Sequence, residues 1–161
     1  MHYCGLNTCD TANGEGVRVS LFVSGCTLHC KGCFNKDAWD FSYGEEFTTE
    51  TFWKIYDALA EEYVSGLSIL GGDPLENANI DEVTKLCRRL KDFYPDKTIW
   101  LYTGRKFSKV KDLPIFRYID VVVDGAFIES KKVHNEFYGS SNQRIIYLKN
   151  EEHTDNPKEV I

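Results

Sequence analysis

VRVSLFVSGCTLHCKGC, residues 17–33, joins an apolar segment to three closely spaced cysteines. Residues 17–24 are apolar and β-branched enough to form a strand, and Gly25 ends that strand directly before Cys26. The cysteines therefore follow the carboxyl end of a strand. In parallel α/β folds, that edge of the sheet is where ligands bind. This segment predicts both a strand and a ligand-binding loop.

Strand-like and helix-like segments alternate along the rest of the chain. Further strands are predicted over residues 67–70, 98–102, 118–123 and 144–148, and amphipathic helices over 48–64 and 80–94, the second with Asn79 as its N-cap. Such alternation predicts right-handed βαβ units, and hence an α/β fold with a mostly parallel sheet. A complete βα barrel typically needs about 250 residues. The 161 residues of this chain therefore predict a partial, incomplete βα barrel or an open twisted sheet.

We expect a single domain over residues 1–150 and a flexible carboxyl-terminal tail over residues 151–161, because the chain has no linker or internal repeat and ends in a polar, acidic stretch. A net charge of −6 disfavours a nucleic-acid partner, which calls for a basic face. The sequence has no signal-peptide pattern and no apolar run of membrane-spanning length. We therefore expect a cytoplasmic protein without membrane contact, in which the six cysteines are reduced.

Cys26, Cys30 and Cys33 form a CxxxCxxC motif within one short loop. Three thiolates at this spacing can converge on one metal centre. A structural zinc usually takes four protein ligands. The candidates for a fourth ligand are His29, Cys4, Cys9 and Cys87. A cubane iron–sulfur cluster held by three cysteines instead leaves one iron open to a chelating ligand. The spacing favours the iron–sulfur cluster and leaves zinc as the alternative.

A second candidate segment is GGDP, residues 71–74, which ends the strand predicted over residues 67–70. Glycine lets the backbone approach a ligand closely, although Gly and Pro are also common turn residues. Glycine turns also follow the other predicted parallel strands, at Gly25, Gly104 and Gly125. In a parallel sheet these turns would ring one site. Thr103 and Asp124 lie beside two of them, where each could contact a ligand or cap a turn or helix.

The CxxxCxxC motif after one strand, followed by GGDP after the next, resembles the radical S-adenosylmethionine superfamily, over the first half of the chain in particular. The resemblance implies one [4Fe-4S] cluster, with Cys26, Cys30 and Cys33 as metal ligands and catalytic residues. It also implies S-adenosylmethionine as the cofactor, which chelates the open iron and whose reductive cleavage yields methionine and a 5′-deoxyadenosyl radical. The implied S-adenosylmethionine contacts are Gly32, Cys33, Phe34, Gly71, Gly72 and Asp73.

The segment DTANGEGVRVSLFVSGCTLHCKGCFNKDAWDF, residues 10–41, resembles the activating proteins of glycyl-radical enzymes. The residues that match their pattern are Asn13, Gly14, Gly16, Arg18 and Asn35. GGDPL, IWLYTG, VVVDGAF and GSSNQRI are similar to segments of one branch, the activators of anaerobic ribonucleoside-triphosphate reductase. Gly32 agrees with this branch, whereas many superfamily members carry there an aromatic residue that lies against adenine. Phe34 is then expected to make the adenine contact, the alternative being packing in the core.

The resemblance implies a radical S-adenosylmethionine oxidoreductase that activates a glycyl-radical enzyme. The substrate would be a glycine in the large subunit of anaerobic ribonucleotide reductase, and the electrons would come from a low-potential donor such as flavodoxin or ferredoxin. The alternatives are an activator of another glycyl-radical enzyme such as pyruvate formate-lyase, an enzyme acting on a small molecule, and, in a different class, a structural zinc-binding module. Cys4 and Cys9 are interpreted as spare thiols, Cys87 as core packing and His29 as facing solvent.

Overall fold

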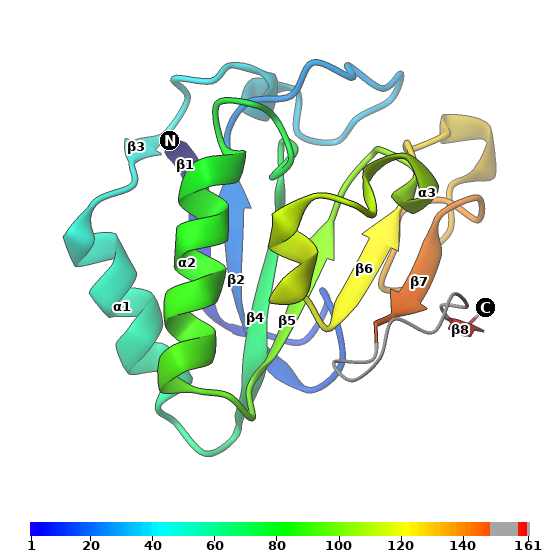
Figure 1. Ribbon diagram of the computed structural model, residues 1–161. Coiled ribbons are helices and arrows are strands. Elements are labelled where there is room, and N and C mark those ends of the chain that lie inside the picture. Colours follow the sequence, from blue (N-terminus) through cyan, green and yellow to red (C-terminus); the bar gives the residue numbers. More distant parts are fainter. Residues whose placement is uncertain (149–157, 161) are drawn as a thin grey trace.

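The computed structural model describes residues 1–148 and 158–160. Within them the strands form one sheet with the order β3-β1-β2-β4-β5-β6-β7-β8, and helices α1 and α2 lie side by side over one face (Figure 1). The strands are β1 His2–Asp10, β2 Val17–Val23, β3 Glu45–Glu46, β4 Val64–Gly71, β5 Thr98–Tyr102, β6 Val121–Asp124, β7 Arg144–Tyr147 and β8 Lys158–Val160. The α-helices are α1 Thr49–Leu59, α2 Ile80–Phe93 and α3 Phe107–Val110, and the 3-10 helices are η1 Lys36–Trp39, η2 Pro114–Arg117 and η3 Glu129–Lys131.

The four central strands β2, β4, β5 and β6 are parallel to one another, as the alternation of strands and helices predicts. The strands beyond them, β1 and β3 on one side and β7 and β8 on the other, pair antiparallel. The α/β class is therefore confirmed, and the sheet is mixed. The sequence analysis misses β1 because its side chains follow no apolar alternation, and Tyr3 and Asp10 are its buried members.

The hydrophobic core lies between the sheet and helices α1 and α2. The buried side chains that meet there include Val19, Leu21, Leu67 and Ile69 from the sheet, Phe52 and Ile55 from α1, and Val83 and Leu86 from α2. Each fully buried side chain of this kind contributes about 1.5–3 kcal/mol. The first helix is capped by Thr48, which accepts a hydrogen bond from the Thr51 N–H, and it ends at Leu59. It is shorter than the predicted 48–64 because β4 already starts at Val64.

Helix α2 occupies the predicted segment, but Asn79 has a different role from the predicted one. Asn79 holds the N-cap position, and within the described residues its side chain makes no cap bond to the helix. Its Nδ2 instead donates to the carbonyl oxygens of Ser24, at 2.9 Å, and Asp73, at 3.3 Å. The predicted N-cap position is therefore confirmed, whereas within the described part of the chain the side chain does not make the hydrogen bond of a helix cap. The side chain attaches the start of α2 to the carboxyl ends of β2 and β4.

The amino-terminal edge of the parallel strands is fastened by the buried Arg18. Its Nε donates to Ser68 Oγ at 2.7 Å, and its Nη2 donates to the carbonyl oxygens of Leu67 and Thr98 at 3.0 and 2.9 Å. The guanidinium also lies 5.5 Å from the centre of the Trp100 ring. Burial lowers the pKa of Arg18 to about 10. Arg18 thus joins β2, β4 and β5 at the edge opposite the cysteines.

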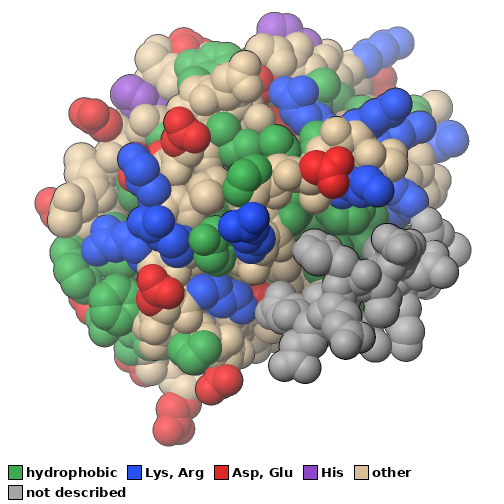
Figure 2. All heavy atoms as spheres, viewed as in Figure 1, with side chains coloured by type: hydrophobic (Ala, Val, Ile, Leu, Met, Phe, Trp, Pro, Cys, Tyr) green, Lys and Arg blue, Asp and Glu red, His purple; other side chains and the backbone are tan. Residues whose placement is uncertain are grey.

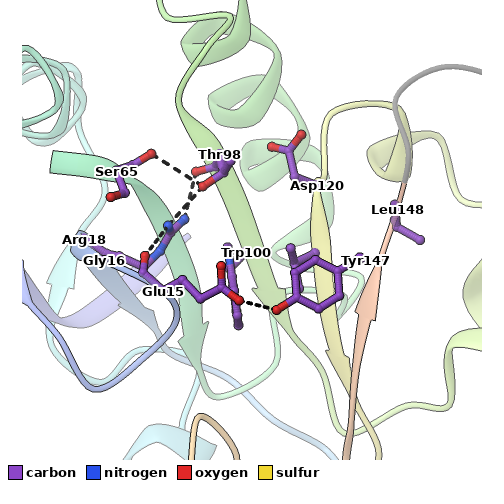
Figure 3. Close-up of a pocket in the computed structure, with 10 residues that line it drawn as sticks. Glu15, Gly16, Arg18, Ser65, Thr98, Trp100, Asp120, Tyr147 and Leu148 are labelled. Atoms are coloured by element: carbon purple, nitrogen blue, oxygen red, sulfur yellow. Dashed lines mark hydrogen bonds between the residues drawn. The ribbon is translucent and has the colours of Figure 1, made fainter. Parts of the chain in front are cut away.

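A cavity of about 370 Å³ opens at this amino-terminal edge (Figure 3). Arg18, Thr98, Trp100 and Tyr147 are among the residues that line it, and the Tyr147 hydroxyl donates a hydrogen bond to Glu15. The cysteines lie at the other end of the same strands. The cavity and the cysteine loop are therefore separate places in the fold.

The predicted tail, residues 151–161, lies mostly outside the described residues. Its described part, Lys158–Val160, pairs antiparallel with β7 as strand β8. The flexibility of the tail stays a prediction.

The surface that carries α1 and α2 has both acidic and basic side chains, with small hydrophobic areas between them (Figure 2). In the described part of the chain, no helix is long and apolar enough to cross a membrane.

Candidate functional site

The three cysteines lie in the loop that joins β2 to η1, at the carboxyl-terminal edge of the parallel strands (Figure 1). Backbone hydrogen bonds close the base of this loop, because the Gly25 N–H donates to the Ala38 carbonyl at 2.7 Å and the Cys26 N–H to the Trp39 carbonyl at 3.3 Å. Cys26 is buried, whereas the other two cysteines are partly exposed, and all three are free thiols. The first cysteine is therefore fixed to the fold, and the other two lie on the outer part of the loop.

Between Cys26 and Cys33, His29 and Gly32 have left-handed backbone conformations, with φ values of 48° and 77°. The exposed His29 ring stacks on the Trp39 ring with 4.2 Å between the ring centres, a contact that helps to hold this unfavourable conformation. At Gly32, an added Cβ atom would lie 2.7 Å from Cδ of Glu129. An aromatic residue at this position would therefore require both a strained backbone and a shift of Glu129.

The sulfur atoms share one loop but do not form a closed set of ligands. Among the described residues, no three Cys, His, Asp or Glu side chains are gathered closely enough to hold a metal ion. The Cys33 N–H donates to the Cys30 carbonyl at 3.1 Å, so these two cysteines belong to one tight turn. In a cubane cluster each cysteine binds a different iron atom, so the three sulfur atoms need not converge on a single point.

The surroundings of Cys26 suit a metal ligand. Burial raises the pKa of its thiol, and hydrogen bonds from the backbone N–H groups of Leu28 and His29 act in the opposite direction. Hydrogen bonds of this kind favour the thiolate, which is the form that binds metal. The pKa of Cys26 is raised overall, by burial first and by the nearby Asp73 and Glu76 carboxylates, and the backbone donors offset only part of this rise.

Of the predicted candidates for a fourth zinc ligand, His29 lies in the cysteine loop with its ring stacked on Trp39, and the three cysteines lie outside that loop. Cys4 Sγ lies on β1, 3.5 Å from the Phe22 carbonyl oxygen to which it donates, and Cys9 is exposed. Cys87 is buried in the core on α2, and burial raises the pKa of its thiol to about 12, which confirms its interpretation as core packing. Within the described residues, the donor set of three loop thiols fits a three-cysteine iron–sulfur cluster better than a structural zinc.

The GGDP turn packs its backbone directly against the base of the cysteine loop. The Gly72 N–H donates to the Val23 carbonyl at 2.7 Å, and the Asp73 N–H donates to the Gly25 carbonyl at 2.9 Å. A Cβ atom on Gly71 would lie 2.4 Å from the Val23 oxygen, and one on Gly72 would lie 2.4 Å from the Gly25 oxygen. Both glycines are therefore required by the close approach of β4 to the end of β2.

The side chain of Asp73 turns inward and is fully buried. One carboxylate oxygen accepts the Leu75 N–H at 2.9 Å, and the other accepts the Thr103 hydroxyl at 2.9 Å and the Gly104 N–H at 3.0 Å. Burial raises the pKa of Asp73, and these hydrogen bonds oppose the change. The carboxylate ties β4 to the turn after β5. The predicted contact of Asp73 with the cofactor stays a prediction. The structure adds the hydrogen bonds that connect Asp73 to Thr103 and Gly104.

Thr103 and Asp124, predicted either as ligand contacts or as caps, are both held by the protein itself. Thr103 donates to Asp73, and the buried Asp124 accepts the Phe107 N–H at 2.7 Å, at the start of α3. Asp124 also pairs with Arg144 Nη2 at 2.7 Å. The structure thus gives both residues the structural role that the sequence left open.

Phe34 follows the third cysteine, and its side chain is 87% exposed. This exposure contradicts the alternative interpretation of Phe34 as a core residue. An outward-facing ring beside the cysteine loop is free to stack on a planar ligand.

Glu76, which no sequence pattern predicts as a site residue, lies two residues beyond the GGDP turn and is 5% exposed. Its Oε1 accepts both the Thr27 N–H and the Thr27 hydroxyl, each at 2.7 Å. The same oxygen lies 3.3 Å from Nη2 of Arg105. No local sequence pattern marks this residue, because its partners lie 49 residues before it, in the cysteine loop, and beyond β5.

Comparison with known proteins places the chain in a family. A family model described as a 4Fe-4S single cluster domain matches residues 12–146. The anaerobic ribonucleoside-triphosphate reductase-activating protein of Enterobacteria phage T4 is 39% identical over 145 residues, which cover 90% of this chain and 93% of the relative. The proteins of that name from Vibrio cholerae and Escherichia coli K12 are 42% and 36% identical, over 90% and 92% of this chain and 97% and 100% of theirs. The chain belongs to the anaerobic ribonucleoside-triphosphate reductase-activating protein family.

The extent of the family match helps to decide which of the six cysteines are candidate cluster ligands in this activating-protein chain. The segment that matches the 4Fe-4S domain excludes Cys4 and Cys9, which precede it. Of the four cysteines inside the segment, Cys87 is buried in the core. Cys26, Cys30 and Cys33 are thus the cysteines that lie both inside the matched segment and outside the core, and their role as cluster ligands stays a prediction.

Proposed function

We propose that this chain is an activating enzyme that uses one [4Fe-4S] cluster on Cys26, Cys30 and Cys33 to cleave S-adenosylmethionine reductively. The observation that carries the proposal is the position of three free thiols in one loop, at the edge where the GGDP turn meets that loop, inside the segment that matches the 4Fe-4S family. A cluster with three protein ligands would supply an open iron for the cofactor and one electron for its cleavage.

Different residues of the chain would bind the cluster and the different parts of that cofactor. Cys26 would act as the ligand at the fixed base of the loop, and Cys30 and Cys33 as the ligands on its outer turn. The exposed Phe34 ring is available to stack on adenine. Gly71, Gly72 and Asp73, whose backbone packs against the base of the loop, would lie at the methionine end of the cofactor, and Gly32 would leave room for adenine.

The proposed target is a glycine of anaerobic ribonucleotide reductase, on which the reaction would leave a glycyl radical. The relatives carry the name of activators of that reductase, which supports this choice over pyruvate formate-lyase. In the described residues, β3 and β8 stand at the two ends of the sheet, so the sheet is open. As an incomplete barrel, it would admit an extended protein loop from the side, where a closed barrel with a filled interior would not. The electron donor would be a low-potential protein such as flavodoxin or ferredoxin.

Anaerobic reconstitution with iron and sulfide tests the proposal. We expect a brown protein with about four iron atoms per chain, formation of 5′-deoxyadenosine from S-adenosylmethionine after reduction, and a glycyl electron-spin signal on the reductase. The variant Cys30→Ser should lose all three, while the matched control Cys9→Ser should keep them, because Cys9 is exposed and precedes the matched segment. A colourless protein with stoichiometric zinc would contradict the proposal, and a signal on pyruvate formate-lyase alone would contradict its target.

A further inference from the structure

Glu76 connects the ends of three parallel strands through one carboxylate oxygen. Glu76 lies in the segment between β4 and α2, Thr27 follows the first cysteine at the end of β2, and Arg105 lies in the segment after β5. The oxygen accepts two hydrogen bonds of 2.7 Å from Thr27 and faces Arg105 at 3.3 Å. Hydrogen bonds to an ionised acceptor are stronger than neutral ones, and burial strengthens them further.

Thr27 is the point at which the cysteine loop leaves its fixed base. Before it, the Gly25 and Cys26 N–H groups are held by the segment of η1. After it, His29 and Gly32 have left-handed conformations, and the turn with the other two cysteines is partly exposed. In the described residues the three sulfur atoms do not converge on a single metal ion, and in a cluster each would bind a different iron atom. A fixed Thr27 would set the position of Cys26 relative to the outer part of the loop.

We propose that Glu76 is a positioning residue that holds Cys26 through Thr27, with Arg105 keeping the Glu76 carboxylate in place. This inference rests on the proposed function, since it assigns to Glu76 the placement of a cluster ligand. Loss of the carboxylate leaves the Thr27 N–H and hydroxyl without their acceptor in a part-buried contact, in which Glu76 is buried and Thr27 is exposed. The loop then has more conformations to lose when the three thiols come together.

The first test uses the chain without any cluster and follows exchange of the Thr27 amide hydrogen by nuclear magnetic resonance. We expect exchange to be about tenfold faster in Glu76→Ala than in the wild type, and intermediate in Glu76→Gln, which keeps an oxygen acceptor without the charge. The matched control is Asp120→Asn, since Asp120 accepts hydrogen bonds from Lys91 and the Ile99 N–H at the opposite edge of the sheet. Equal exchange rates in all four proteins would overturn the proposal.

The second test uses anaerobically reconstituted proteins and records the half-life of the cluster absorbance in excess iron chelator, together with the electron-spin spectrum of the reduced state. We expect the half-life to fall about tenfold in Glu76→Ala and the spectrum to broaden, with partial recovery in Glu76→Gln and no change in Asp120→Asn. A role in folding alone would lower the melting temperature without changing the spectrum of the folded fraction.

The two tests separate the inference from the function on which it rests. A wild type that takes up no iron would overturn the proposed function, and the amide exchange would still report on the contact between Glu76 and Thr27. A wild type that binds a cluster, with a Glu76→Ala variant of the same half-life and spectrum, would overturn the positioning role and leave the proposed function intact. If Glu76→Ala does not fold, Thr27→Val replaces it, because valine removes the hydroxyl donor and keeps the shape.

Discussion

At the scale of single residues, the carboxyl group of Asp73 combines full burial with donors from β5 and from its own turn. Because burial raises its pKa in the folded state above the ordinary value of 3.8, the protonated form stabilises the fold. This contribution is complete below pH 3.8 and is lost as the pH rises through the raised value. A residue that looks like a ligand contact in the sequence is thus also a source of pH dependence in the stability.

We predict that Asp73→Asn, which resembles the protonated form, removes this pH dependence. The free energy of unfolding of the wild type minus that of the variant should decrease as the pH rises from 3.8 toward neutrality. Urea unfolding of both proteins between about pH 3 and pH 8 measures this difference. A difference that grows with pH would show that the hydrogen bonds outweigh the burial and that the pKa of Asp73 is lowered.

A second residue-scale prediction concerns Gly32. Alanine at this position must adopt a φ of 77° and come against Glu129, so we expect Gly32→Ala to lose about 1–2 kcal/mol of unfolding free energy. The double variant Gly32→Ala with Glu129→Ala should recover the loss of unfolding free energy that comes from the contact with Glu129. It should keep the loss that comes from the strained backbone. Thermal unfolding of the set measures both parts, and a neutral Gly32→Ala would contradict the assigned strain.

The sequence predicts the candidate site where its members are adjacent and fails where they are not. Cys26, Cys30 and Cys33 are found because eight residues hold all three. Thr103, a partner of Asp73, is 30 residues away, and Thr27, a partner of Glu76, is 49 residues away. Such contacts depend on strand register, which a local pattern does not contain.

At the scale of helices and strands, the start of α2 is held by a side chain that points away from the helix. The position of Asn79 follows from local sequence, whereas its bonds to Ser24 and Asp73 follow from the close packing of β2 and β4. The same limit explains why β1 is missed, since a partly exposed antiparallel strand carries no apolar signal. The parallel strands are predicted because they are buried on both faces.

We predict that Asn79→Asp destabilises the fold by about 1–3 kcal/mol, as much as Asn79→Ala. Aspartate is as good an N-cap as asparagine, but it cannot donate a hydrogen bond to a carbonyl oxygen. A helix cap would therefore be preserved in Asn79→Asp, whereas the bonds to Ser24 and Asp73 would be lost. Urea unfolding distinguishes the two roles, and an Asn79→Asp variant as stable as the wild type would favour the cap.

At the scale of the whole molecule, the carboxyl-terminal and amino-terminal edges of the parallel sheet have separate roles. The carboxyl-terminal edge carries the cysteine loop, the GGDP turn and the turns after β5 and β6. The amino-terminal edge is joined by the hydrogen bonds of Arg18. The alternation of strands and helices predicts that all ligand-facing turns lie at one edge of the sheet. It contains no information on which side chains connect the strands at the opposite edge.

We predict that Arg18→Met lowers the free energy of unfolding by more than about 3 kcal/mol, because the carbonyl groups of Leu67 and Thr98 lose their donor. The iron content per folded chain after reconstitution should not change, since Arg18 lies at the edge away from the cysteines. Arg88→Met is the matched control, because Arg88 is exposed on α2. Thermal unfolding and iron analysis together test the separation of the two edges, and a folded Arg18→Met without iron would refute it.

The stack of His29 on Trp39 gives the cysteine loop its own optical reporter. Indole emission is sensitive to a ring in contact with it, so closure of the loop around a ligand would change the fluorescence of Trp39 as soon as His29 moved. The other two tryptophans stand apart from this event, with Trp100 buried beneath Arg18 and Trp53 on α1. Subtracting the emission spectrum of a Trp39→Phe variant would isolate the fluorescence of Trp39. The rate of ligand binding could then be measured without any added label.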